Sequence, residues 1–162
     1  MTSYDFFDTD KTGEPSYDLA GSEYNNLLTK CFEYCTSISF IVRSNHISIP
    51  SALLPNQLPV TPTIQKEYER YRDSNPEVRI FHFHLSTNVY QAISGITDSI
   101  FKWIDGWGNK NPEDPIFYRA DGSIFFSSVI HEGKCSLFPR EDEDVSSVLD
   151  NPLWIKHIES NG

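Results

Sequence analysis

The chain has 162 residues, of which 23 are acidic and 13 are basic, so its formal net charge is −10. Its length and its 38% hydrophobic content predict a single domain, residues 1–162, built around one core. An excess of carboxylates repels the phosphates of nucleic acids and anionic membrane surfaces, so we expect neither as a partner. No apolar run reaches the roughly 20 residues of a membrane-spanning helix, and the first residues do not resemble a signal peptide. The sequence therefore predicts a cytoplasmic protein.

The three cysteines indicate buried, reduced thiols. An odd number of cysteines in a chain without an export signal favours free thiols over a disulfide framework. Cys31 and Cys35 are four residues apart and share one face of a predicted helix, whereas Cys135 lies in a predicted strand. Three residues separate Cys31 from Cys35, while a redox pair has two. We therefore expect small core residues rather than a metal or redox site.

The first part of the chain predicts an arm, a helix and a strand. Residues 1–21 are polar and acidic but carry four aromatic rings, so we expect an arm that is docked on the domain or partly mobile. From Ser22 to Cys35, apolar residues recur at helical spacing, and Ser22 is the expected N-cap. Residues 37–44 are rich in β-branched and aromatic residues and predict a strand.

The middle of the chain predicts an irregular crossing, a short helix and a second strand. Residues 45–63 contain four prolines, which favour an irregular segment. Residues 63–73 are densely charged and predict a short exposed helix. Residues 78–85 alternate, with apolar residues on both faces, so we expect a strand well inside a sheet.

The next element is expected to be the longest helix. Apolar residues recur every three or four positions from Ser86 or Thr87 to Ile104, which is the clearest amphipathic pattern in the chain. Gly106 is expected to end this helix, and residues 106–109 then read as a flexible loop.

The last third predicts a three-stranded meander, with strands at residues 116–120, 123–131 and 134–138. Asp121-Gly122 is a strong signal for a hairpin turn between the first two strands. Residues 145–149 predict a short helix. Together these elements predict an α+β fold, in which a mostly antiparallel sheet with a C-terminal meander is packed by two main amphipathic helices.

Catalytic motifs are absent from the sequence, so we expect no enzyme and no cofactor. Ser127 and Ser128 lie in mid-strand rather than on a sharp glycine-flanked turn. His82 and His84 are two residues apart on a strand and point the same way, so with His131 they form an alternative metal site. The simpler interpretation is that alternation places polar histidines on a half-exposed sheet face.

The surplus of carboxylates is uneven along the chain, and aromatic residues accompany it. Acidic residues concentrate near the N-terminus, between residues 98 and 121, and between residues 132 and 144. Such runs are usually solvated surface. Aromatic anchors rimmed by carboxylates are also the composition of an interface for a basic protein. The candidate partner-binding residues are Asp105, Trp107, Glu113, Asp114, Glu141, Asp142, Glu143 and Asp144.

In its format, its meander at residues 118–133 and its acidic segment after Pro139, the chain resembles the immunity proteins of bacterial polymorphic toxin systems. The resemblance implies a cytoplasmic, non-enzymatic inhibitor that binds a cognate toxin, often a basic enzyme, and occludes its active site. The alternatives are the metal-binding enzyme or module described above, and a non-catalytic oligomeric ligand-binding domain whose acidity serves solubility.

Overall fold

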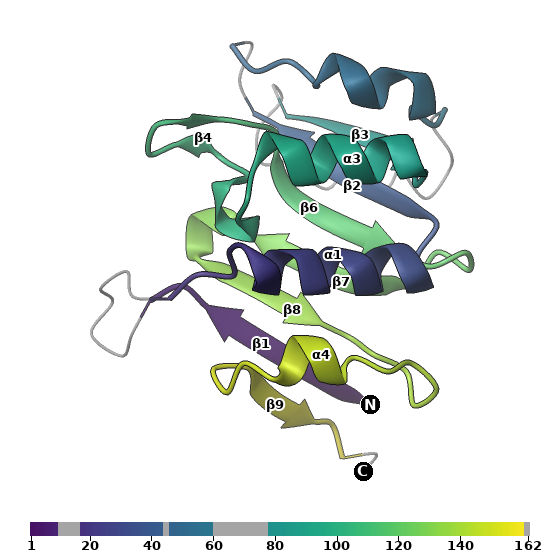
Figure 1. Cartoon of the computed structure of the whole chain (residues 1–162), viewed down its shortest axis with the longest axis vertical. Helices are drawn as coiled ribbons and strands as arrows, with labels where there is room; N and C mark the ends of the chain where they lie inside the picture. The colour runs from purple at the N-terminus through teal and green to yellow at the C-terminus, as the bar shows by residue number, and fades with distance from the viewer. Residues whose placement is uncertain (10–16, 44–45, 60–77, 161–162) are drawn as a thin grey trace.

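The computed structural model describes residues 1–9, 17–43, 46–59 and 78–160. These residues form a seven-stranded antiparallel sheet in the order β3-β2-β6-β7-β8-β1-β9, with helices across one face (Figure 1). The strands are β1 (Thr2–Phe7), β2 (Ser37–Val42), β3 (Arg79–His84), β6 (Glu113–Tyr118), β7 (Ile124–Val129), β8 (Lys134–Leu137) and β9 (Ile155–Ile158). The helices are α1 (Ser22–Tyr34), α3 (Thr87–Ile96) and α4 (Ser146–Leu149). The predicted α+β fold with a mostly antiparallel sheet is confirmed.

Short elements complete the described structure. A separate two-stranded sheet consists of β4 (Asp105–Gly106) and β5 (Asn109–Lys110). The described residues also include three short 3-10 helices: η1 (Ser51–Asn56), η2 (Ile100–Lys102) and η3 (Ile130–Glu132). The helix expected at residues 63–73 lies outside the described residues.

Helix α1 packs on the sheet through the apolar positions that the sequence indicates. Tyr24, Leu27, Leu28 and Cys31 are buried, at the i, i+3, i+4, i+7 spacing of one helix face. The expected N-cap at Ser22 is wrong by one residue. Gly21, with φ of 60°, precedes the helix, and Ser22 is its first helical residue.

The C-terminal meander is confirmed, since β6, β7 and β8 are neighbours in the sheet. The backbone N–H of Gly122 donates to Arg119 O at 2.9 Å and closes the predicted hairpin turn. A shift in register between β6 and β7 lies beside Phe125 and Phe126, which are both fully buried. A β-bulge of this kind lets two consecutive rings enter the core.

Helix α3 is shorter than predicted, because it ends at Ile96 rather than near Ile104. The hydroxyl of Thr97 accepts the backbone N–H of Ser99 at 3.0 Å, and the hydroxyl of Ser99 accepts that of Phe101 at 3.1 Å. These local side-chain bonds satisfy backbone groups that a continuing helix would use. Ile104 is still buried. The apolar pattern therefore predicted correctly that residues beyond Ile96 contact the core, but not that the helix continues through them.

Strand β3 lies at an edge of the sheet, so the expected interior position is wrong. The residues after η1 cover this edge. Leu58 donates its N–H to the carbonyl of His82 at 2.8 Å, and Gln57 forms a bridge to Phe83. The backbone of Gln57 and Leu58, which is not in a strand, therefore covers the outer edge of β3. This explains why the sequence of β3 resembles that of an internal strand.

The two ends of the chain supply strands that the sequence did not reveal. Strand β1, within the expected acidic arm, lies between β8 and β9. Phe6 of β1 is fully buried, and its ring centroid lies 5.4 Å from that of Trp154. Residues 2–7 of the expected arm are therefore docked on the domain, as an internal strand of the sheet.

The cysteines are free and buried, as predicted. Burial raises the pKa of Cys31 and Cys135 well above the usual thiol value and raises that of Cys35 to about 12. All three thiols are therefore neutral near pH 7.

Candidate functional site

Trp107 stands at the tip of the β4–β5 hairpin and is 74% exposed. Trp107 and Gly108 form the two-residue turn, with φ of 49° and 83°. Positive φ at both central residues is typical of the turns whose twist matches a β-hairpin. The flexible loop expected at residues 106–109 is therefore a defined hairpin that projects from the body of the molecule (Figure 1).

The base of the hairpin is fixed by hydrogen bonds to the rest of the fold. The carboxylate of Glu113 accepts the backbone N–H of Asp105 at 3.0 Å. The backbone N–H of Asn111 donates to Ile104 O at 3.1 Å, and its side-chain amide donates to Lys102 O at 2.9 Å. The hairpin therefore presents Trp107 from an anchored base.

Glu113 and Asp114 lie in the interior, each 1% exposed, so their expected role as partner-facing residues is wrong. Arg43 explains their burial. Its Nε lies 2.8 Å from Oε2 of Glu113, and its Nη2 lies 3.3 Å from Oδ2 of Asp114. Arg43 directly follows β2, which pairs with β6, so sheet pairing brings the guanidinium to both carboxylates.

Two further contacts complete this group, which we call the anchoring cluster: Arg43, Glu113, Asp114 and His131. Oδ1 of Asp114 accepts the backbone N–H of Ile130 at 2.8 Å, and Nε2 of His131 lies 2.9 Å from Oε2 of Glu113. Burial raises the pKa of Asp114. The backbone of Asp114 has φ of 52°, a region that non-glycine residues rarely occupy. The cluster joins β2, β4, β6 and η3.

The three histidines of the alternative metal site are not brought together. His82 is buried with its ring 5.5 Å from that of Tyr118, whereas His84 is exposed at the end of β3. His131 bonds to Glu113. Among the residues that the structure describes, no three His, Cys, Asp or Glu side chains converge on a possible metal position.

The second acidic group, residues 141–144, is divided between surface and interior. Glu143 is nearly buried and forms a two-pronged ion pair with Arg119, with Nε to Oε1 at 2.7 Å and Nη2 to Oε2 at 2.6 Å. Arg119 lowers the pKa of Glu143 through these hydrogen bonds. Glu143 is therefore structural, which corrects its expected partner-binding role. Glu141, Asp142 and Asp144 are exposed.

The two predicted groups lie at opposite ends of β6. Glu113 begins this strand and contacts the hairpin, whereas Arg119 follows its end and holds Glu143. A six-residue strand spans roughly 20 Å. The predicted residues therefore do not form one compact cluster around Trp107.

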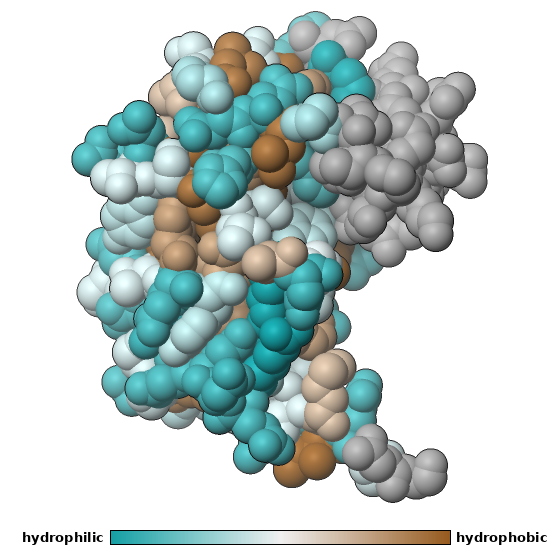
Figure 2. Space-filling model, turned by 90° about the vertical axis from the view of Figure 1, so that its right-hand side faces the viewer, coloured by the Kyte–Doolittle hydropathy of each residue, from teal (hydrophilic) through white to brown (hydrophobic). Residues whose placement is uncertain are grey.

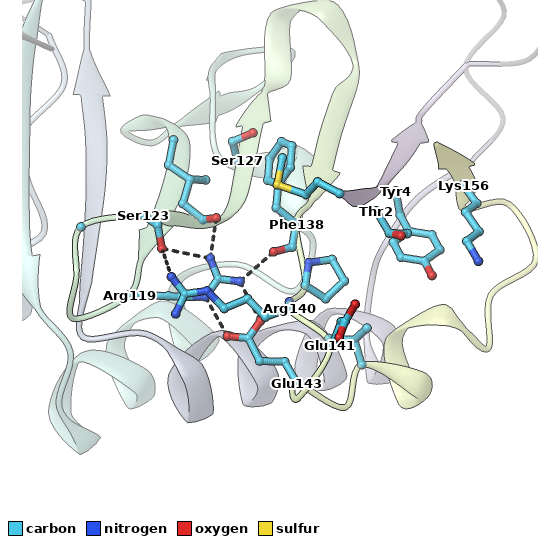
Figure 3. Close-up of a pocket in the computed structure, with 15 residues that line it drawn as sticks. Thr2, Tyr4, Arg119, Ser123, Ser127, Phe138, Arg140, Glu141, Glu143 and Lys156 are labelled. Carbon is cyan, nitrogen blue, oxygen red and sulfur yellow. Dashed lines mark hydrogen bonds and ion pairs between the residues drawn. The ribbon is translucent and has the colours of Figure 1, made fainter. Parts of the chain in front are cut away.

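A hollow of about 1150 Å³ lies beside the second group, where the β6–β7 hairpin and the segment after β8 meet β1 and β9 (Figure 3). Arg119 forms an ion pair with Glu143. Arg140 forms an ion pair with Asp121 and donates a hydrogen bond to the hydroxyl of Ser123. These two guanidinium groups are therefore already paired with carboxylates of the protein. Local sequence patterns do not indicate this hollow, because segments from both ends of the chain line it.

A smaller hollow of about 420 Å³ lies beside the hairpin, between the end of α3 and β5. Ile96, which is partly exposed, lines it from α3, and Asn109 lines it from β5. Asp98 also lines it and pairs with Lys102 at 2.6 Å. We call Ile96, Asp98, Asp105, Trp107 and Asn109 the hairpin surface.

Comparisons with known proteins add no family. The chain matches no protein-family model, no curated protein and no solved structure. Among the described residues, each helix is too short or too polar to cross a bilayer.

Proposed function

We propose that this protein is an immunity-type inhibitor that binds a cognate basic toxin in the bacterial cytoplasm and neutralises it by occluding its active site. The observation that carries the proposal is Trp107, 74% exposed on a hairpin whose base is anchored. Tryptophan is enriched among the few residues that supply most of the energy of an interface. An anchored presentation reduces the entropy lost on binding.

Charge supports a basic partner. The chain carries a formal net charge of −10, and Asp105 is exposed two residues before Trp107. A net negative charge accelerates encounter with a cationic surface and disfavours acidic competitors. An inhibitor of this design needs no catalytic group of its own, because it acts by covering the partner.

The test pairs this chain with each protein encoded beside its gene. Each is co-expressed with the chain in bacterial cells, growth is recorded, and the affinity of the purified pair is measured by calorimetry at low and high salt. We expect rescue of growth by one pairing and an affinity that falls as salt rises. Trp107→Ala should lower the affinity about 30-fold, which corresponds to about 2 kcal/mol.

Two controls locate the site. Tyr17→Ala removes another exposed aromatic ring, and charge reversal by Glu141→Lys with Asp142→Lys changes the distant acidic group. Both should leave the affinity within about threefold of the unaltered protein, because neither lies on the hairpin surface. An unchanged affinity for folded Trp107→Ala would reject this surface. Failure of every neighbouring toxin to bind would reject the inhibitor function.

A further inference from the structure

Strand β9 forms an open edge of the sheet. All four of its residues are exposed, and β1 is its one strand neighbour among the described residues. The opposite edge differs, because Leu58 bonds to the backbone of β3 and covers it. Uncovered backbone at an edge strand is a template for pairing with another strand.

The register shows which backbone groups of β9 point outward. The N–H of Glu159 donates to Met1 O at 3.0 Å, and the terminal ammonium of Met1 lies 3.5 Å from Glu159 O. Hydrogen-bonded pairs alternate along an antiparallel ladder, so His157 also faces β1. The N–H and C=O of Lys156 and Ile158 therefore point away from the sheet.

The same edge carries exposed apolar side chains. Ile158 is 70% exposed and Ile155 is 49% exposed, one on each face of the strand. In the side view of Figure 2, the end of the molecule that holds β9 projects at the bottom and carries hydrophobic surface. Pairing of this edge would cover both backbone groups and isoleucine side chains.

We infer that β9 pairs antiparallel with β9 of a second copy of this chain, about a two-fold axis at Ile158. The N–H and C=O of Ile158 then bond to the C=O and N–H of the same residue in the second copy. His157 lies opposite Glu159 of the second copy, and Lys156 lies opposite Ser160. Two seven-stranded sheets become one continuous antiparallel sheet.

Charge and shape select this register over its neighbours. Outward-facing groups must meet outward-facing groups, so the axis passes through a residue rather than between two, and we compare the axes at Lys156, His157 and Ile158. An axis at Lys156 opposes two ammonium groups, and an axis at His157 opposes two imidazoles. An axis at Ile158 pairs isoleucine with isoleucine and gives two His157–Glu159 pairs, which are favourable cross-strand neighbours. His157 also lies 3.1 Å from Asp5 of its own chain.

Sedimentation of the full chain from micromolar to millimolar concentration tests the dimer. We expect a concentration-dependent dimer for the unaltered protein and a monomer for Ile158→Pro. Proline is tolerated on an edge strand when its missing N–H points outward, so this variant should keep its circular dichroism spectrum. A monomer at every concentration of the unaltered protein overturns the inference, as does a dimer of Ile158→Pro.

Oxidative cross-linking tests the register. Directly opposed, hydrogen-bonded residues have Cα atoms about 5.5 Å apart, within reach of a disulfide. Ile158→Cys should therefore give a covalent dimer, while the native cysteines are buried and unreactive. The matched control is Ile155→Cys, also exposed on β9, whose counterpart lies several residues along the second strand. Equal cross-linking of the two variants would overturn the register.

This inference is separate from the inhibitor function, since β9 and the β4–β5 hairpin lie at opposite ends of the molecule (Figure 1). Ile158→Pro is expected to leave toxin affinity at the hairpin surface unchanged, and Trp107→Ala is expected to leave the dimer intact.

Discussion

The buried carboxylate of Glu113 accepts the backbone N–H of Asp105, eight positions earlier in the chain, at 3.0 Å. The same carboxylate pairs with Arg43 and contacts His131. One side chain thus connects the central sheet to the hairpin that carries Trp107. The stability of the anchoring cluster and the position of the exposed tryptophan are consequently linked.

Removal of this carboxylate should destabilise the fold. Glu113→Ala leaves the Asp105 N–H without its acceptor and Arg43 with one carboxylate instead of two. Because Arg43 is partly exposed, we expect a loss of about 2–3 kcal/mol in the free energy of unfolding, measured with urea. The exposed neighbour Glu132 supplies the control, since Glu132→Ala should change it by less than about 0.5 kcal/mol. Equal effects of the two variants would contradict the structural role of Glu113.

The Arg119–Glu143 pair should contribute stability that acid removes. Arg119 holds the pKa of Glu143 below its ordinary value of 4.5, so folding favours the charged carboxylate. This contribution is complete above pH 4.5 and is lost as pH falls through the lower pKa of the folded state. Glu143→Gln should cost about 2 kcal/mol at pH 7, and the difference from the unaltered protein should shrink in acid. Urea unfolding across pH 3–7 measures this difference in the free energy of unfolding, and the exposed Glu141→Gln serves as the control. A difference that stays constant across this pH range would contradict the Arg119–Glu143 pairing.

Asp114 should show the opposite dependence on pH. Burial raises its pKa above the ordinary value of 3.8, so the folded state binds the proton more tightly than the unfolded state. Its contribution to the free energy of unfolding therefore falls as pH rises from about 3.8 through the raised pKa of the folded state. Asp114→Asn does not titrate, so the unaltered protein should lose stability relative to this variant over that interval. A difference that rises with pH would contradict the burial of Asp114.

Gly133 should tolerate alanine less well than Gly122. Both residues have positive φ, but a Cβ on Gly133 would lie 1.9 Å from Oδ1 of Asp8, whereas a Cβ on Gly122 meets open space. We expect Gly122→Ala to cost about 1 kcal/mol and Gly133→Ala about 2–3 kcal/mol in thermal or urea unfolding. Combining Gly133→Ala with Asp8→Ala removes the clash and should lower the additional cost. Equal costs for the two single variants would argue against the close approach of Asp8.

The three cysteine thiols should be unreactive in the folded protein. Burial raises the pKa of all three cysteines, and a thiolate is the species that attacks a disulfide reagent. A colorimetric thiol reagent at pH 7 should react slowly with the native protein and with three thiols per chain in denaturant. Rapid reaction of one thiol under native conditions would show that its site opens to solvent.

Local patterns predicted the parts of the fold that have local causes. The apolar face of α1 follows from residues three and four apart, and the β6–β7 turn follows from Asp121-Gly122. Strand β9 gave no such signal, because an exposed edge strand has no buried face to impose alternation. The end of α3 was missed because hydroxyl bonds at Thr97 and Ser99, rather than glycine or proline, terminate it.

The candidate site was likewise predicted only in part from the sequence. Trp107 was identified from its glycine neighbours and its nearby carboxylates, and the structure places it on the surface. Glu113 and Asp114 have the same acidic character in the sequence but face inward, because Arg43 reaches them across a strand pair. Charge composition does not distinguish a solvated carboxylate from one whose cation lies about 70 positions away in the chain.

The position of β1 between β8 and β9 has a consequence for the order of folding during synthesis. The first strand leaves the ribosome well before either of its neighbours exists, and its contact with β8 closes a loop of about 130 residues. Contacts of such long range form slowly. The backbone of β1 therefore stays without its strand neighbours until β8 has been synthesised.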